Sequence, residues 1–503
     1  MADARIHGAR KNIIVSLGCQ VITLLCGIIV PQLMIRAYGS EVYGATVSIA
    51  QFLSYITLLE GGLGGVARAV LYKPLAEHDD DKTSAVMAEV RRFFRIVGCA
   101  FLVYVLVIAC SFNTISRTEI FDWTATFLLV ITISISTFSQ YFIGISNMIL
   151  LQAAQKQYIT NLVNIAGVVA NTAAVIILIA LKCDIITVKL ASSVVFALKP
   201  IALWLYVRKH YRLRSVPVTQ TRHLTQKWSG IGQHIAYFLH SNTDVVILTC
   251  FVGLKPVAVY SVYHMVVANM QNIASSFVSG MEALFGDMFA KDERRQLQES
   301  FNVYETIISV AAIVLFSVTT VMLVPFVRIY AAGVTDANYE APVFACLLTA
   351  SALLYCLRMP YHSMIIAAGH FRQTQLAAYG EAAMNVLLSI LLVHRYELSG
   401  VAFATLAATG FRMIYYAIYL SQNILHRSIG IFAKRTLLNV AIFLIILITG
   451  EQITKRFIME NYGVWIICSF VVTVMALVIT VVANGLLFRR NFRAALAMWR
   501  NRR

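Results

Sequence analysis

The stretch LLEGGLGGVARAV, from Leu58 to Val70, decides between two kinds of fold because its glycines match two patterns. GLGGVA within it satisfies G-x-G-x-x-A, a form of the dinucleotide-binding fingerprint, which needs a preceding strand and a surrounding βαβ unit. GGLGG satisfies G-x-x-x-G, which lets two membrane helices approach closely. The sequence on either side determines which pattern has a physical meaning.

Composition excludes a soluble fold around this stretch. Of the 503 residues, 59% are hydrophobic and 13% are charged, whereas soluble domains contain roughly 45–50% apolar and about 25% charged residues. Apolar segments recur that are long enough for a membrane-spanning helix, which needs about 20 mostly apolar residues. The sequence therefore predicts an all-α polytopic membrane protein.

Short polar connections separate about 14 predicted transmembrane helices. Their expected limits are 12–35, 43–66, 93–113, 124–147, 158–181, 187–207, 228–252, 259–281, 302–327, 341–362, 375–393, 399–421, 436–454 and 464–488. The longest predicted loops are 67–92, 208–227 and 283–300. The first apolar run is too long for a signal peptide and has no small-residue cleavage site.

Lys and Arg are concentrated on one side of this predicted topology. With the N-terminus inside, most of the 41 Lys and Arg residues, including Arg91-Arg92 and Lys434-Arg435, fall in inner loops. Cytoplasmic loops carry such an excess, so both termini are expected in the cytoplasm. The net charge of +17 is accounted for by these loops, and no nucleic-acid partner is expected. Most of the nine cysteines lie in apolar segments, so no disulfide framework is predicted.

The two halves of the chain resemble each other. LLQAAQKQYITNLVNIAGVVANT (150–172) lies over SMIIAAGHFRQTQLAAYGEAAMNV (363–386) at an offset of 214, which places Asn171 on Asn385. Parallel repeats of this kind are a transporter architecture, with the substrate site between the halves. We therefore expect two six-helix bundles related as a repeat, followed by two extra C-terminal helices. The expected domains are 1–227 (N-terminal bundle), 228–435 (C-terminal bundle) and 436–503 (two additional transmembrane helices and a basic cytoplasmic tail).

This topology answers the question that the glycines raise. The run from Gly61 to Gly65 ends the second predicted span at the inner surface, and no strand or βαβ unit surrounds it. Close helix packing through small residues, or a bend in the helix, is the interpretation that remains.

Cations inside predicted spans are costly and mark functional sites by default. The cations that we single out are Lys199 in the sixth span, Arg358 in the tenth and Arg412 in the twelfth; His362 shares a helix face with Arg358. All four are candidate substrate-binding residues. The two arginines suit a phosphate, because the planar fork of arginine can donate two hydrogen bonds to its oxygens. The alternatives are that each cation pairs with a carboxylate of the protein, or that Lys199 and Arg412 reach out to an interface.

Carboxylates inside spans supply candidate coupling groups. The carboxylates that we single out in spans or at their ends are Glu60, Asp244, Glu282, Glu305 and Glu381. A buried carboxylate can take up and release a proton, so Asp244, Glu60 and Glu282 are candidate coupling residues. Asp244 lies deepest; it could instead be the fixed partner of a cation, and His240, four residues earlier on the same face, is its expected internal partner.

Polar residues follow one face of the fourth, fifth, seventh, eighth and twelfth predicted spans. Such stripes can be hydrogen-bonding contacts between helices. Their occurrence in both halves favours a common wet cavity. No Walker A, H-E-x-x-H, G-x-S-x-G or Cys-x-x-Cys motif appears, so we expect no enzyme, no catalytic residue, no metal and no cofactor.

The chain resembles the multidrug/oligosaccharidyl-lipid/polysaccharide exporter (MOP, MATE-like) superfamily, and within it the Wzx-type O-antigen repeat flippases. The resemblance rests on KNIIVSLGCQVITLLCGIIVPQLMIRAYGSEVYGATVSIAQ (11–51), on LLEGGLGGVARAV, on DVVILTCFVG (244–253) and on LSGVAFAT (398–405). It covers nearly the whole chain. It implies two six-helix bundles around a central cavity that work by alternating access.

The resemblance also implies a substrate and a location. The substrate would be a polyprenyl-pyrophosphate-linked oligosaccharide, moved from the inner to the outer leaflet of the bacterial inner membrane for O-antigen, capsule or exopolysaccharide assembly. Its partners would be membrane lipids, with the polysaccharide polymerase and the chain-length machinery as further candidates. A cationic cavity suits the anionic pyrophosphate, although no motif of the family assigns Lys199, Arg358 or Arg412 as ligands.

Three other functions are compatible with parts of the pattern. A multidrug exporter of the superfamily would favour an acidic cavity, and many proton-coupled ones carry an acidic residue in the first span, where this chain has none. A lipid II flippase would carry arginines in the first bundle, whereas the first span here contains no arginine until Arg36 at its outer end. A membrane scaffold or polymerase partner is disfavoured by the repeat and the polar stripes, and a polymerase would be expected to carry a large external loop, which is missing.

Overall fold

The computed structural model describes residues 2–117, 120–214, 231–276 and 281–489. The basic tail after 489, most of the predicted loop 208–227 and the end of the eighth predicted span lie outside the described residues. The Cα positions form two compact units, the first from 1–238 and 253–258 and the second from 239–252 and 259–503. Each unit is described by itself.

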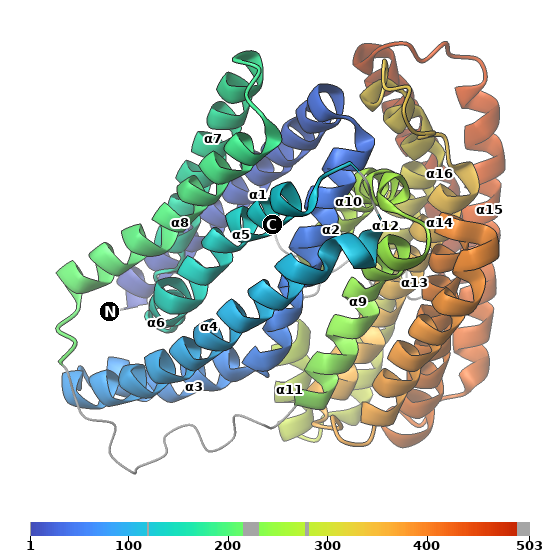
Figure 1. Ribbon diagram of the computed structural model, residues 1–503. Helices are drawn as coiled ribbons and strands as arrows, with labels where there is room; N and C mark the ends of the chain where they lie inside the picture. The colour runs from blue at the N-terminus through green and yellow to red at the C-terminus, as the bar shows by residue number, and fades with distance from the viewer. Residues whose placement is uncertain (1, 118–119, 215–230, 277–280, 490–503) are drawn as a thin grey trace. The chain divides into compact units, whose positions relative to one another are not determined.

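The described part of the first unit is built of helices joined by short connections (Figure 1). They are α1 (Ala2–Tyr38), α2 (Ser40–Ser54), the 3-10 helix η1 (Tyr55–Glu60), α3 (Leu63–Ala76), α4 (Asp80–Ser116), α5 (Trp123–Ser139), the π-helical turn η2 (Gln140–Gly144), α6 (Ile145–Ala153), α7 (Gln157–Ala180) and α8 (Ile185–His210). Asp122 and Asp184 begin α5 and α8 by accepting hydrogen bonds from backbone N–H groups of the first turn, which a helix start otherwise leaves unpaired.

The second unit is also helical in its described part. It contains α11 (Met281–Ala290), α12 (Arg294–Tyr330), α13 (Pro342–Ala367), α14 (Gln375–Asn423), α15 (Ile429–Thr454) and α16 (Tyr462–Leu487). Helices α9 (Ile231–Phe251) and α10 (Leu254–Ser276) begin in the first unit and continue into the second. All nine cysteines are free.

Eleven helices of the described chain are long and apolar enough to cross a membrane. Helix α14 is one of them, but its 49 residues are two helical legs, because Glu397 has non-helical φ and ψ angles of 44° and −122°. The legs, 375–396 and 398–423, correspond to the eleventh and twelfth predicted spans. Helices α9 and α10 are 21 and 23 residues long but are not among the eleven, because their polar side chains lower the hydropathy. The all-helical membrane fold is confirmed.

The glycine run that opened the sequence analysis is a break between two helices. Gly61 and Gly62 both have left-handed backbone angles, with φ of 55° and 78°, a conformation that glycine adopts without steric cost. A Cβ atom on Gly62 or Gly65 would meet no heavy atom within 4 Å, so these two glycines do not pack closely against another helix. The bend is confirmed, and close packing is not observed at these two positions.

Two predicted loops are wrong. The region 67–92 contains most of α3 and the first turns of α4, and the region 283–300 contains most of α11 and the start of α12. Charged residues in these segments, such as Asp80, Asp81 and Lys82 at the start of α4, look like loop residues in a hydropathy reading. They extend a spanning helix beyond its apolar part, because a helix continues wherever its backbone hydrogen bonds continue.

The repeat is confirmed by the helix limits. Helices α4 and α12 are both 37 residues long, and they begin and end 214 positions apart. Helices α2 and α10 begin at Ser40 and Leu254, and α6 and α13 end at Ala153 and Ala367, which is the same separation. The predicted offset therefore relates corresponding helices of the two halves.

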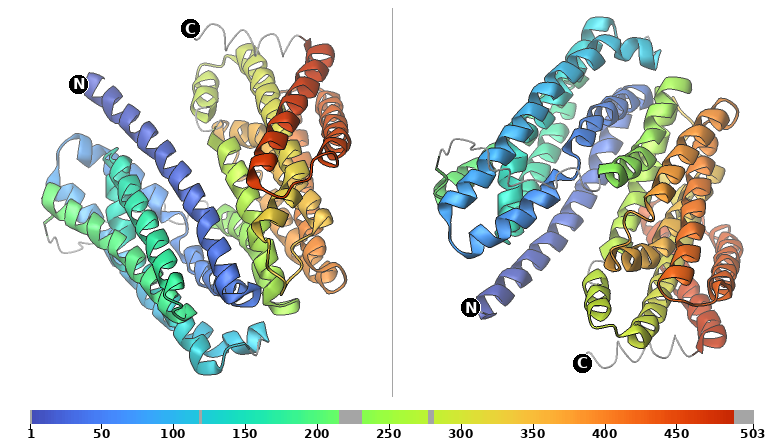
Figure 2. Two further views of the ribbon diagram at one scale, coloured as in Figure 1. Left: turned by 90° about the horizontal axis from the view of Figure 1, so that it is seen from above. Right: turned by 90° about the horizontal axis from the view of Figure 1, so that it is seen from below.

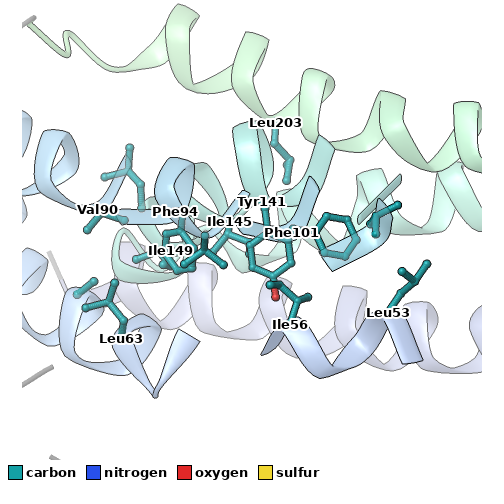
Figure 3. Close-up of a cluster of buried hydrophobic side chains, with 14 of the residues drawn as sticks. Leu53, Ile56, Leu63, Val90, Phe94, Phe101, Tyr141, Ile145, Ile149 and Leu203 are labelled. Carbon is teal, nitrogen blue, oxygen red and sulfur yellow. The ribbon is translucent and has the colours of Figure 1, made fainter. Parts of the chain in front are cut away.

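Apolar side chains from α2 to α8 form the core of the first unit. Phe94 and Phe101 of α4 are buried with the Tyr141 ring (Figure 3), whose centroid lies 6.4 and 6.1 Å from theirs. Leu203 of α8 closes the same cluster. The core thus holds the π-helical turn, which carries Tyr141, against α4.

The extra helices α15 and α16 pack on α12. Both views of Figure 2 show them side by side at the red end of the colour scale. The Trp465 indole of α16 donates a hydrogen bond of 3.0 Å to the Met322 carbonyl oxygen of α12. A Cβ on Gly450 of α15 would lie 2.8 Å from Val321, so α15 also approaches α12 closely. The last two predicted spans therefore belong to the second unit.

Candidate functional site

Two arginines of the second unit hold one glutamate in the interior of the helices. Arg358 lies near the middle of α13, Glu381 in the first leg of α14 and Arg412 in its second leg. The break at Glu397 lets the legs lie side by side, where Asn385 Nδ2 of the first donates to Thr405 Oγ1 of the second at 2.9 Å. The chain reversal in α14 is what brings Glu381 and Arg412 together.

Glu381 accepts from each arginine with a different oxygen. Arg358 Nη1 donates to Oε1 and Arg412 Nη1 donates to Oε2. The Glu381 side chain is 1% exposed, and the two arginine side chains are 6% and 7% exposed. Arg412 also donates from Nε and Nη2 to the Tyr416 hydroxyl, at 3.0 and 2.7 Å. The Arg358 guanidinium lies over the Tyr355 ring, 5.0 Å from its centroid.

Histidines complete this arginine–glutamate cluster. His240 of α9 places Nε2 3.6 Å from Glu381 Oε1 and 3.4 Å from Thr409 Oγ1. His362 stacks on the Tyr416 ring with centroids 5.9 Å apart. The predicted internal pair of His240 with Asp244 is wrong, because His240 faces Glu381. Of the four predicted substrate ligands, the structure therefore brings Arg358, His362 and Arg412 together.

The alternative of protein-internal pairing is confirmed for both arginines, yet one carboxylate cannot neutralise two guanidiniums. With both histidines neutral, Arg358, Arg412 and Glu381 together carry a net charge of +1. Burying an uncompensated charge is costly in a protein interior, and more so at membrane depth. The cluster is therefore a place where an additional anion would be stabilised.

The first unit forms the corresponding helices without these charges. At the offset of 214, Gly144 stands in the place of Arg358 and Gly167 in the place of Glu381. A Cβ on Gly144 would lie 2.6 Å from Gln140 Oε1 and 3.2 Å from Pro200 Cβ, and one on Gly167 would lie 2.4 Å from Lys199 Cδ. The side chains of Gln140 in η2 and of Pro200 and Lys199 in α8 fill the space there. The repeat therefore folds without the charged cluster, which favours a functional reason for it.

Lys199 is separate from the cluster and lies in the first unit. Its Nζ donates to Asn164 Oδ1 of α7 at 2.8 Å and lies over the Phe196 ring, 4.5 Å from its centroid. Among the described residues no carboxylate forms an ion pair with Lys199, so pairing with a carboxylate is not observed for it.

The three predicted coupling residues accept hydrogen bonds from hydroxyl groups. Asp244 Oδ2 accepts from the Tyr260 hydroxyl at 3.0 Å and from Thr405 Oγ1 at 3.2 Å. Glu60 Oε1 accepts from the Tyr141 hydroxyl, which joins the end of η1 to the π-helical turn. Glu282 Oε1 accepts from Ser363 Oγ at 3.4 Å. None of the three has a cation as its hydrogen-bond donor in these contacts.

A second carboxylate lies between two arginines, and the sequence analysis missed this cluster. Glu305 of α12 pairs with Arg427 at 3.2 Å and with Arg435 at 2.9 Å. Both arginines are buried, although they follow the twelfth predicted span and were expected in an inner loop. The Tyr361 hydroxyl also donates to Glu305. The carboxylate inside a spanning helix was the signal, because it requires a nearby cation.

No group of three or more His, Cys, Asp and Glu side chains converges as metal ligands within the described ranges. The Asn385 side chain is linked to Asp244 through Thr405. Its Nδ2 donates to the Thr405 hydroxyl, which in turn donates to Asp244, and its buried Oδ1 has no hydrogen-bond partner within the described residues.

Comparisons with known proteins agree on the fold and the family. The family model for polysaccharide biosynthesis proteins matches residues 9–285. The lipid II flippase MurJ in an inward closed conformation has a similar structure, with a TM-score of 0.68, 12% identity, and coverage of 95% of this chain and 98% of that one. An inward-facing multidrug resistance MATE family transporter of the MOP superfamily has a TM-score of 0.58, 14% identity, and coverage of 81% and 98%.

The MATE multidrug transporter DinF-BH has a TM-score of 0.57, 14% identity, and coverage of 82% and 95%. A search of curated protein sequences found no match. The solved structures share the fold of this multi-pass membrane protein. Since the family model matches more than half of the chain, the chain belongs to the polysaccharide biosynthesis protein family, with the fold of the MOP superfamily of flippases and transporters.

Proposed function

We propose that the protein is a Wzx-type flippase. In this proposal it moves a polyprenyl-pyrophosphate-linked oligosaccharide repeat unit from the inner to the outer leaflet of the bacterial inner membrane, for assembly of a surface polysaccharide such as O-antigen, capsule or exopolysaccharide. Both termini lie in the cytoplasm, as the Lys and Arg bias favours. The protein is a transporter without catalytic residues, and the polymerase and chain-length machinery are its candidate partners.

One observation carries the proposal: the two buried arginines Arg358 and Arg412 share the single carboxylate of Glu381, on helices long and apolar enough to cross a membrane. A pyrophosphate offers several anionic oxygens, and arginine donates to such oxygens in pairs. A cationic drug would be repelled by the net positive charge of the arginine–glutamate cluster. The family of polysaccharide biosynthesis proteins supports a glycan as the remainder of the substrate.

The other predicted residues take roles within this proposal. Lys199 and His362 are further substrate contacts, and Asp244, Glu60 and Glu282 are candidates for coupling to an ion gradient. The bundles 1–227 and 228–435 open the substrate site alternately to the inner and the outer leaflet. The segment 436–503 contributes two additional transmembrane helices and a basic tail. The similar MATE family transporter is described as inward-facing, which is one of the states that alternating access requires.

The test is deletion of the gene in its host, followed by extraction of polyprenyl-linked glycans. The deletion strain is complemented with wild type, Arg358→Gln, Arg412→Gln and Arg328→Gln. Arg328 is a matched control because it also pairs with a glutamate, Glu340, at 2.7 Å, but its side chain is 58% exposed. Protein abundance in the membrane is measured for every strain, so that loss of function is not confused with loss of protein.

We expect the deletion strain to accumulate the lipid-linked repeat unit and to lose its surface polysaccharide. Wild type and Arg328→Gln should restore export, whereas Arg358→Gln and Arg412→Gln should not. Rescue by all variants would refute the assignment of the arginines. Accumulation of lipid II with cell lysis would indicate a lipid II flippase, and unchanged glycans with altered sensitivity to cationic dyes would indicate a multidrug exporter.

A further inference from the structure

We propose that Glu381 is a built-in competitor of the substrate for the two arginines. Its carboxylate occupies Arg358 and Arg412 in the unloaded protein, and a phosphate group of the substrate displaces it. This inference rests on the proposed function, because it assumes an anionic substrate at the same cluster. It adds a role for Glu381, which neither touches the substrate nor couples transport to an ion.

The contacts of Glu381 are those that a phosphate would take over. Its two oxygens each accept one hydrogen bond, from Arg358 Nη1 and from Arg412 Nη1. Neither arginine uses its fork bidentately on the carboxylate. Arginine has five N–H donors, and no hydrogen bond of Arg358 other than the one to Glu381 is found within the described residues. Donors therefore remain for the additional oxygens of a pyrophosphate.

Charge decides that Glu381 must withdraw when the phosphate binds. The two guanidiniums neutralise a doubly charged pyrophosphate by themselves, whereas a carboxylate left between them would face the phosphate oxygens. Two negative charges that contact the same guanidiniums repel each other strongly in a low-dielectric interior. The same repulsion acts in the opposite direction at the end of the cycle, when the returning carboxylate helps to release the substrate. A transport site must bind loosely enough to let its cargo leave.

A second partner for the displaced carboxylate is already in place. His240 of α9 lies 3.6 Å from Glu381 Oε1, on a helix other than those that carry the two arginines. Thr409 Oγ1 lies 3.4 Å from the same imidazole nitrogen. Glu381 can therefore exchange its arginine contacts for a contact with His240 by rotating its side chain.

Packing does not explain the glutamate. Gly167 of α7 occupies the corresponding position of the first unit, where α7 and α8 come together without a carboxylate. If Glu381 served only to neutralise the arginines, a second carboxylate would make the cluster neutral, and none is paired there within the described residues. A single carboxylate for two arginines is what a displaceable competitor requires.

The test compares the affinity of the purified full-length chain in detergent for geranyl pyrophosphate, a short polyprenyl pyrophosphate, in wild type, Glu381→Gln and Glu305→Gln. Glu305 is a matched control, because it is also buried between two arginines, Arg427 and Arg435. Geraniol, which has no phosphate, controls for the lipid chain. Thermal unfolding and gel filtration show whether each variant is folded.

We expect Glu381→Gln to bind geranyl pyrophosphate about tenfold more tightly than wild type, the factor that one charge-assisted hydrogen bond is worth. Glu305→Gln should bind like wild type. In the complemented strain, Glu381→Gln should export more slowly, because the arginines no longer release the substrate. Glu381→Asp, whose shorter side chain reaches the arginines less well, should bind with intermediate affinity, and it replaces Glu381→Gln if the latter does not fold.

Unchanged or weaker binding by Glu381→Gln, with wild-type binding intact, would overturn the competitor role and leave the proposed function standing. An equal gain in Glu305→Gln would also overturn it, because the gain would then come from any freed arginine pair. Absence of binding in wild type and in every variant would overturn both the inference and the anionic substrate on which it rests.

Discussion

Replacing Gly44 by alanine should disrupt the contact between α2 and the first turn of α10. Gly44 of α2 lies in the segment 11–51, which carries part of the resemblance to the exporter superfamily. A Cβ at Gly44 would lie 1.9 Å from the Leu254 carbonyl oxygen and 2.8 Å from its carbon. Ordinary contacts between such atoms begin at roughly 3.5 Å, so the two backbones would have to separate by about 1.5 Å.

The cost follows from the kind of atom that is in the way. Overpacking typically costs about 1–3 kcal/mol when side chains can adjust. Here the obstacle is the backbone of a buried helical turn, so we expect about 3 kcal/mol, the upper end of that range. For a unit of this size, such a loss corresponds to a decrease of about 6–12 °C in the midpoint of thermal unfolding.

Thermal unfolding of the purified protein in detergent measures this decrease. Gly18→Ala is the control, because a Cβ at Gly18 of α1 would meet no atom within 4 Å, and alanine in a helix is favoured over glycine by about 1 kcal/mol. Gly18→Ala should therefore unfold at the wild-type temperature or slightly above it. If Gly44→Ala unfolds with Gly18→Ala rather than well below it, the close approach of the two backbones is refuted.

Three further substitutions test other parts of the structure. Glu305→Gln leaves the buried Arg427 and Arg435 without their carboxylate partner and should destabilise the protein by about 3–5 kcal/mol. Thermal unfolding measures the loss, and a change below about 1 kcal/mol would contradict the buried pairing. Gly167→Ala places a Cβ 2.4 Å from Lys199 Cδ and should move the flexible Lys199 side chain away from Asn164 with little loss of stability. If Lys199 binds substrate, export by Gly167→Ala should fall as far as export by Lys199→Gln. Normal export would show that Lys199 does not belong to the substrate site. Asp184→Ala removes the cap of α8 and should cost about 1 kcal/mol, whereas Asp184→Asn should retain most of it. Hydrogen bonds from Thr187 hold the pKa of the Asp184 carboxyl below its usual range, so the charged cap is fully present above about pH 4 and is lost as the pH falls further; a difference between wild type and Asp184→Ala that persists undiminished at about pH 2 would contradict this.

The fold class could be predicted because it depends on local properties. The length and apolarity of segments determine which of them can cross a membrane, and the offset of 214 between the halves could be read from a few matched residues. Helix ends were predicted less well. Asp80 starts α4 well before its apolar part, because charged residues continue a helix as readily as they form a loop.

The candidate site was predicted in its residues but not in its pairs. The rarity of charges inside spans singled out Arg358, Arg412 and Asp244. It did not show that Glu381 would join both arginines, or that His240 would face Glu381 rather than Asp244. Helical spacing relates residues on one helix, whereas these contacts join different helices whose rotation about their axes is decided by packing.

By itself the sequence determined that this chain is a helical membrane protein built from a repeat, because the free energy of placing each segment in the membrane depends on that segment's own composition. Only the tertiary structure decided which charges are paired. Arg427 and Arg435 look like loop cations along the chain, yet both are buried against Glu305. The energy of a buried ion depends on the distance to its partner, and that distance exists only once helices far apart in sequence have come together.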